Sequence, residues 1–96
     1  MTPSFVVRST PRYERLFRKL LQHQPELQAL RDRVGVILST DPYNRTQAHH
    51  IKKLEDVSPG EGQYRLRIAR WRFRYDVYGQ EVVLQSCGLR REDTYR

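Results

Sequence analysis

The stretch YRLRIARWRFRYDV, residues 64–77, alternates five arginines with apolar and aromatic residues and contains a single acid, Asp76. A period of two is typical of a β-strand, because successive side chains point to opposite faces of a sheet. The alternation holds over residues 63–69 and again over residues 71–78. The stretch therefore predicts two antiparallel strands joined as a β-hairpin.

A two-residue turn at Ala69-Arg70 sets the predicted register of this hairpin, although Ala-Arg suits a type I′ turn poorly. With this turn, the apolar face pairs Ile68 with Trp71, Leu66 with Phe73, and Tyr64 with Tyr75. The other face pairs Arg67 with Arg72 and Arg65 with Arg74. Opposed like charges destabilise a sheet by some tenths of a kcal/mol to about 1 kcal/mol per pair. Such a cluster of forked donors indicates an anionic ligand such as phosphate.

Two amphipathic helices are predicted before the hairpin. The first starts with a cap at Ser9 or Thr10 and with Pro11 in its first turn. The second starts near Pro25 and ends within residues 39–44. The apolar stripes are Tyr13, Leu16, Phe17, Leu20 and Leu21, then Leu27, Leu30, Val34, Ile37 and Leu38. The short connection predicts an antiparallel helical hairpin.

Three further segments complete the predicted sheet. Residues 5–9, 50–55 and 81–88 are rich in β-branched residues or alternate in polarity, and turn-forming residues separate them from their neighbours. The chain is expected to be one α+β domain over residues 1–96. Its N-terminal strand and antiparallel two-helix hairpin would pack on a twisted antiparallel sheet of about four strands.

The charge balance favours a polyanionic partner. The 96 residues include 18 lysines and arginines against 11 acids, a formal net charge of +7. Nucleic acid, an anionic membrane surface and an acidic protein are the partner classes that such a charge attracts. The excess of positive charge lies inside the hairpin and not in a basic tail, so it belongs to a folded surface.

Several other classes of protein are not expected. Cys87 is the only cysteine, which excludes an intramolecular disulfide and fits a reducing compartment. No apolar run is long enough to span a membrane, and the N-terminus lacks the pattern of a signal peptide. No metal site, glycine-rich phosphate loop or Ser-His-Asp arrangement is indicated.

Four stretches of the chain resemble the RelE/ParE superfamily of bacterial type II toxin–antitoxin modules: KKLEDV at 52–57, YRLRI at 64–68, RWRFRYDV at 70–77 and RREDTYR at 90–96. The resemblance implies a cytoplasmic toxin that cleaves mRNA in the ribosomal A site without metal or small-molecule cofactor. A ribose 2′-hydroxyl would attack the adjacent phosphate, which would give a 2′,3′-cyclic phosphate and release a free 5′-hydroxyl. A cognate antitoxin protein would restrain the toxin.

The same resemblance implies roles for individual residues. Arg67 would bind and polarise the phosphate, and Arg72 would stabilise the charge of the transition state. Arg91 (or Arg90) would assist the leaving group, and Tyr95 would orient the hydroxyl or stack on a base. The RNA-binding residues implied are Lys52, Lys53, Arg65, Arg74 and Arg90.

The general base is the role with the most open alternatives. Some RNA-cleaving relatives carry lysines where this chain has Arg65 and Arg67, and arginine cannot give up its proton. His50 is a candidate base, because histidine titrates near neutral pH. His49, Lys52 or Lys53, and Asp76 remain alternatives.

Two other functions are open at this point. A toxin of the ParE branch would poison DNA gyrase and cut no RNA. A non-catalytic basic module would bind only an acidic antitoxin peptide. Arginines in place of lysines favour these two functions, whereas the terminal tyrosine beside arginines favours the nuclease.

Overall fold

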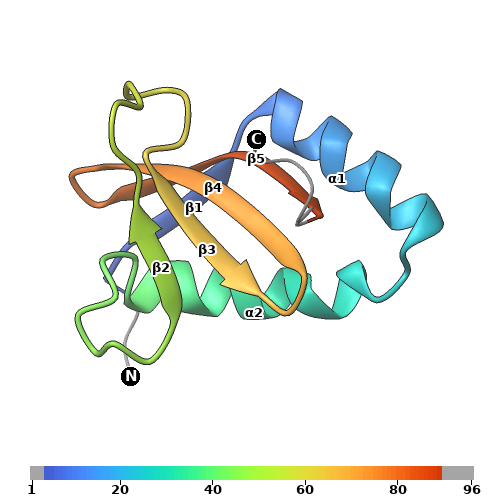
Figure 1. The fold of residues 1–96 in the computed structure, drawn as a ribbon, viewed down its shortest axis with the longest axis horizontal. Coiled ribbons are helices and arrows are strands. Elements are labelled where there is room, and N and C mark those ends of the chain that lie inside the picture. Colours follow the sequence, from blue (N-terminus) through green and yellow to red (C-terminus); the bar gives the residue numbers. More distant parts are fainter. Residues whose placement is uncertain (1–3, 90–96) are drawn as a thin grey trace.

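The computed structural model describes residues 4–89, and these residues form an α+β fold with two helices and a five-stranded mixed sheet. The sheet is open, its strand order is β1-β5-β4-β3-β2, and the helices cover one of its faces (Figure 1). In chain order the elements are β1 (Val6–Ser9), α1 (Pro11–His23), α2 (Leu27–Thr40), β2 (His50–Lys53), β3 (Tyr64–Ile68), β4 (Trp71–Tyr78) and β5 (Glu81–Leu89).

Both predicted helices are present, and the cap of the first is confirmed as Thr10. The Thr10 hydroxyl accepts a hydrogen bond from the backbone N–H of Tyr13 at 3.1 Å, and Pro11 occupies the first turn. Pro25 lies just before α2 and not inside it. The helices diverge from their connection, so that α1 packs chiefly on β5 while α2 contacts β1 (Figure 1). They contact the sheet more than each other.

The predicted hairpin register is confirmed at every pair, from Ile68 opposite Trp71 to Tyr64 opposite Tyr75. Ala69 takes a φ of 54°, and Arg70 does not have a positive φ. Positive φ at the first central residue alone is the pattern of a type II′ turn. An alanine therefore occupies a position that favours glycine.

The prediction of an antiparallel sheet of about four strands holds for β2 to β5 alone, because β1 joins the sheet as a fifth, parallel strand. Val6 donates its N–H to the Gln80 carbonyl at 2.8 Å, and Thr10 donates to the Leu84 carbonyl at 3.1 Å. β1 therefore lies along the outer edge of β5. A four-residue strand carries no sequence signal for a partner some 75 residues further along the chain.

A β-bulge interrupts the pairing of β4 with β5. Arg74 is opposite Ser86, whereas the next residue, Tyr75, is opposite Leu84, so Gln85 is the extra residue. The Gln85 side chain donates to a carboxylate oxygen of Asp76 at 3.0 Å.

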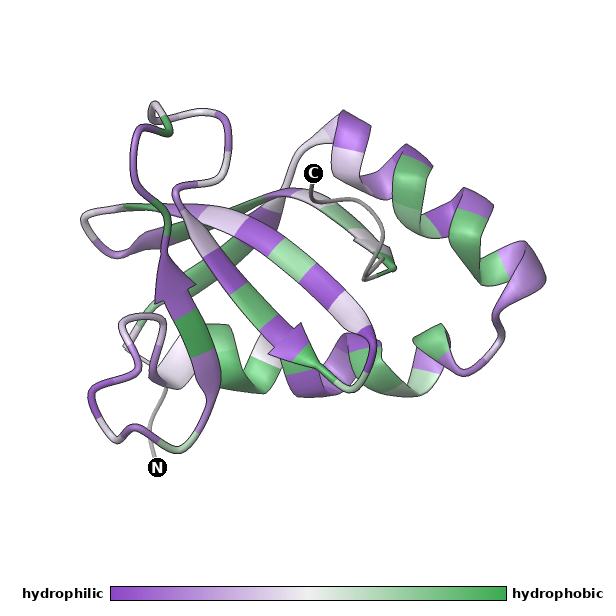
Figure 2. Ribbon diagram, in the orientation of Figure 1, coloured by the Kyte–Doolittle hydropathy of each residue, from purple (hydrophilic) through white to green (hydrophobic). Residues whose placement is uncertain are grey.

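The core lies between the helices and the apolar face of the sheet. Figure 2 shows hydrophobic and hydrophilic residues alternating along β3 and β4, as the sequence pattern requires. The largest fully buried side chains include Trp71, Tyr75, Phe73, Leu27 and Leu38. Neither helix in the described part of the chain has the length and apolar character needed to cross a membrane.

Candidate nucleic-acid interface on the sheet

The strand register places the basic residues of three strands in two rows across the polar face of the sheet. One row runs from Lys52 through Arg65 and Arg74 to Ser86. The second row runs from His50 through Arg67 and Arg72 to Gly88. Residues directly opposite each other on neighbouring strands share a face and lie about 4.5–5.5 Å apart. We call the set Lys52, Arg65, Arg74, His50, Arg67 and Arg72 the basic face.

The four arginines of the basic face are half-buried and lie on the sheet. The Nε atoms of Arg65 and Arg72 are shielded from solvent, which places the guanidinium stems of these residues against the surface of the sheet. The neighbouring pairs carry like charge across the β3–β4 ladder. This arrangement favours an anion that spans several strands.

Arg70, the fifth arginine of the hairpin, takes no part in the basic face. Its guanidinium donates to Glu26 at 2.7 Å and to Gln24 at 2.8 Å, and so ties the turn to the segment between the helices. The hydrogen bond from Arg70, more than any other influence, lowers the pKa of the Glu26 carboxyl below its ordinary value. Arg70 therefore has a structural partner, and it is a matched control for the arginines of the basic face.

Lys53 lies on the opposite face from Lys52. It pairs with Tyr64, and its ammonium group lies 5.8 Å from the centre of that ring. Tyr64 in turn stacks on Tyr75, with ring centroids 5.5 Å apart. The structure thus brings Lys52 to the basic face and leaves Lys53 beside an aromatic stack at the end of the core.

Asp76 shares the face of Arg74 but is fully buried under the loop that precedes β3. Its carboxylate accepts backbone N–H groups from Gly60 at 2.9 Å, Gly62 at 3.0 Å and Gln63 at 2.8 Å. Arg74 donates through Nε and an Nη to the Gly62 carbonyl at 3.1 and 2.9 Å. Asp76 is therefore the anchor of this loop, and its oxygens are not available to remove a proton from a substrate.

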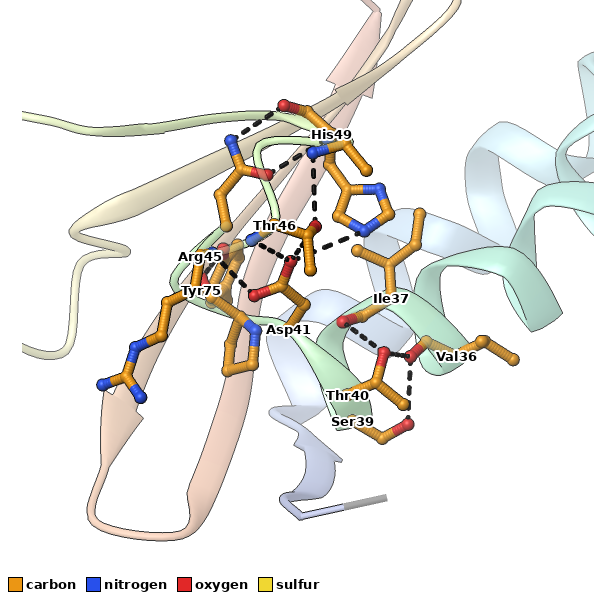
Figure 3. A network of polar contacts seen from close by, with 12 residues as sticks. Val36, Ile37, Ser39, Thr40, Asp41, Arg45, Thr46, His49 and Tyr75 are labelled. Atoms are coloured by element: carbon orange, nitrogen blue, oxygen red, sulfur yellow. Dashed lines mark hydrogen bonds and ion pairs between the residues drawn. The ribbon is translucent and has the colours of Figure 1, made fainter. Parts of the chain in front are cut away.

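Of the two adjacent histidines, His50 belongs to the basic face and His49 does not. His50 is exposed at the first pair of β2, directly opposite Arg67. His49 turns its Nε2 toward the Asp41 carboxylate, 3.9 Å away (Figure 3). The alternative bases thus separate: His50 lies with the arginines, and His49 belongs to the loop between α2 and β2.

Asp41 organises that loop (Figure 3). It accepts the N–H of Arg45 at 2.8 Å, and Thr46 donates both its N–H at 3.2 Å and its hydroxyl at 2.6 Å. Burial acts to raise the pKa of Asp41, but the hydrogen bonds from Thr46 and Arg45 and the nearby His49 outweigh it, so the net direction is down. The buried Tyr75 hydroxyl donates to the Pro42 carbonyl at 2.6 Å, which fixes the loop to the sheet.

Three predicted site residues, Arg90, Arg91 and Tyr95, lie outside the described residues. Cys87 is half-buried on the core side of β5, opposite Phe73. Burial, with a smaller effect from Glu14, raises the pKa of the Cys87 thiol to about 12. The thiol therefore stays protonated near neutral pH and is a poor nucleophile.

Sequence reasoning missed two features of the site. Ser86 joins the basic face only because the bulge at Gln85 shifts its register, and no local pattern indicates this. Arg33 of α2 lines a hollow together with His50 and Arg67, because the loop between α2 and β2 folds back on the helix. An arginine on a helix is otherwise typical of a solvated face.

Comparisons of the chain with protein-family models, with curated proteins and with solved structures found no match.

Proposed function

We propose that this protein is an RNA-cleaving toxin of the RelE/ParE type, which cuts mRNA in the ribosomal A site by attack of a 2′-hydroxyl on the adjacent phosphate. The observation that carries the proposal is the basic face, where two rows of basic residues cross three strands of the sheet. A single-stranded RNA is a chain of phosphates that such a surface can follow over several nucleotides.

In this proposal the row from His50 through Arg67 to Arg72 is the catalytic row. Cleavage places extra negative charge on the phosphorus centre, and fixed guanidinium donors aimed at that charge lower the barrier. Arg67 and Arg72 are directly opposed, so a phosphate between them meets donors from both strands. The row with Lys52, Arg65 and Arg74 holds the flanking phosphates.

His50 is the general base in this proposal. It is the neighbour of Arg67 in the catalytic row, and neutral imidazole accepts a proton where guanidinium cannot. His49 faces Asp41, and Asp76 is held by the loop. Arg91, with Arg90 beside it, and Tyr95 would act on the leaving group and the hydroxyl, as the family resemblance implies.

The finer fold and the biological setting belong to the same proposal. Two helices followed by a twisted sheet whose central strands form an arginine-rich hairpin fit a RelE-like domain, with β1 added at one edge. The protein would act in the cytoplasm, where the ribosomes are. A cognate antitoxin with acidic character would neutralise the basic face and block access of RNA to it.

The test is to add purified protein to a ribosome complex programmed with a defined mRNA and to map cuts by primer extension. The new ends would be examined for a 2′,3′-cyclic phosphate. We expect cutting in the A site, reduced about 10²- to 10³-fold by Arg72→Ala because one charge-stabilising donor is lost. Arg70→Ala is the matched control, since this arginine pairs with Glu26 outside the basic face.

One observation favours a second function, a toxin of the gyrase-directed ParE branch or a basic module that binds an acidic peptide. The four strand positions of the hairpin carry arginine and no lysine, and Arg74 already donates twice to the Gly62 carbonyl. Such a surface binds anions without cutting them. Intact mRNA, in cells whose growth the protein still arrests, would overturn the nuclease and support this second function.

A further inference from the structure

A small hollow lies at the edge of the sheet, where α2 passes under the start of β2. Its volume is about 150 Å³, and residues from the helix, the preceding loop and β3 line it. A second, shallower hollow of about 500 Å³ adjoins it along α2 and shares Arg33, Ile37 and His49 with it. Together they form a groove that leads from the exposed side of the helix to the basic face.

The inner hollow combines three apolar residues with a rim of basic side chains. The apolar residues are Ile37, Leu66 and Ile68. The charged or titratable side chains that line it are Arg33, His49, His50 and Arg67. Figure 3 shows the His49 ring next to the side chain of Ile37, with Asp41 on its other side. No carboxylate lines the inner hollow among the described residues.

The size and chemistry of the hollow suit one flat, polar aromatic ring. A cavity of roughly 150 Å³ is large enough to hold benzene, so it takes a nucleobase more readily than a whole nucleotide. A base that enters must accept hydrogen bonds, because the rim offers mainly donors. Guanine presents two acceptors, N7 and O6, on one edge, and the forked guanidinium of arginine matches them.

We propose that this hollow is a guanine subsite in which Arg33 reads the N7 and O6 edge and His49 borders the ring. Arg33 is exposed on α2 and makes no ion pair within residues 4–89, so its guanidinium is available. The backbone of His49 makes two hydrogen bonds with the Asn44 side chain, and its Nε2 lies 3.9 Å from an Asp41 carboxylate oxygen. Adenine and cytosine present amino donors where the rim has no acidic acceptor, and they fit it less well.

The position of the subsite connects it to the catalytic row. His50 and Arg67 belong both to the hollow and to the row that ends at Arg72. Neighbouring strands are about 4.8 Å apart, so Arg72 lies roughly two strand spacings, about 10 Å, from the His50 edge. A base in the hollow would therefore leave its own phosphate close to Arg67. This inference rests on the proposed function, because the base would belong to a nucleotide at the cleavage site.

The first experiment measures binding without any cleavage. The intact protein is titrated with 5′-GMP, 5′-UMP, guanosine and inorganic phosphate, and amide and arginine side-chain shifts are followed by NMR. We expect 5′-GMP to bind about tenfold more tightly than 5′-UMP and to shift the signals of Arg33 and His49. Arg33→Gln should remove this preference, while Arg15→Gln, an exposed arginine of α1, should keep it.

The second experiment is the mapping of mRNA cuts on programmed ribosomes, and together with the binding data it separates the subsite from the nuclease. Equal binding of both nucleotides, or binding of phosphate as tight as that of 5′-GMP, would overturn the guanine subsite. Cutting of mRNA with no preference for guanine beside the cut would also overturn it, and would leave the nuclease standing. A guanine preference in binding with mRNA left intact would support the subsite and overturn the nuclease.

Discussion

Arg67 and Arg72 stand directly opposite each other across the β3–β4 ladder, so the central hairpin of the sheet carries a like-charge pair next to the core. Like charges at opposed positions weaken a sheet. We expect Arg67→Gln to raise the free energy of unfolding by several tenths of a kcal/mol at low salt and to weaken RNA binding. Denaturant titration at low and high salt checks the first part, because salt should shrink the gain. A gain that is unchanged by salt would contradict this origin.

Among the polar residues of the described chain, we expect substitution of Asp76 to lower the free energy of unfolding the most. Its buried carboxylate accepts three backbone N–H groups and the Gln85 amide, and Asp76→Asn replaces one accepting oxygen by a donor. Since hydrogen bonds to a charged group contribute about 1.5–3 kcal/mol, we expect a loss of about 3 kcal/mol in denaturant unfolding. Gln85→Ala removes only one of these bonds and should cost about 1 kcal/mol. Equal losses for the two variants would show that Asp76 is not the anchor.

The turn residue Ala69 should accept glycine with a gain. Its φ of 54° is a conformation that glycine adopts without strain, so we expect Ala69→Gly to stabilise the protein by about 1 kcal/mol. Ala29→Gly, in the first turn of α2, is the control and should destabilise the protein, because glycine is a poorer helix former than alanine. Thermal unfolding of the two variants should therefore shift in opposite directions.

The opposite substitution, glycine to alanine, should stabilise the protein at Gly35. It lies within α2, and a Cβ built there meets no heavy atom within 4 Å. We expect Gly35→Ala to raise the free energy of unfolding by about 1 kcal/mol, because alanine loses less backbone freedom in a helix. A destabilised variant in the same measurement would mean that the space beside α2 is filled in solution.

The pKa of Asp41 predicts how stability falls in acid. The folded-state pKa lies below the unfolded value of about 3.9, so this carboxylate adds stability above that pH. The contribution should disappear as the pH falls from about 4 through the lower folded pKa. The free energies of unfolding of the unchanged protein and of Asp41→Asn should therefore differ most at neutral pH and converge in strong acid. A constant difference across that range would exclude this linkage.

The hairpin was predictable from sequence because its information is local. Strict alternation fixes which side chains share a face, and two turn residues fix the register, so Arg65 opposite Arg74 followed from the letters alone. Alternation also separates Lys52 from Lys53. It does not tell which of them joins the arginines, because that depends on the pairing of β2 with β3.

The features that the sequence did not predict depend on contacts between distant residues. Asp76 binds a loop that begins more than a dozen residues before it. β1 pairs with a strand at the other end of the chain, and Arg33 meets His50 through a folded-back loop. Neither periodicity nor turn chemistry encodes such long-range contacts, so the loop anchor, the mixed sheet and the hollow beside α2 are visible only in the folded protein.

The bulge at Gln85 divides β5 into two halves of opposite phase. Before it, Val82 and Leu84 point to the core; after it, Cys87 and Leu89 do. The parallel partner β1 ends at Ser9, opposite Leu84 and next to the bulge, so only the first half of β5 pairs with β1. Removing a single residue at this point would send the inward side chains of one half outward. The length of β5 is therefore fixed more strictly than its composition, and this strand should tolerate substitution far better than deletion.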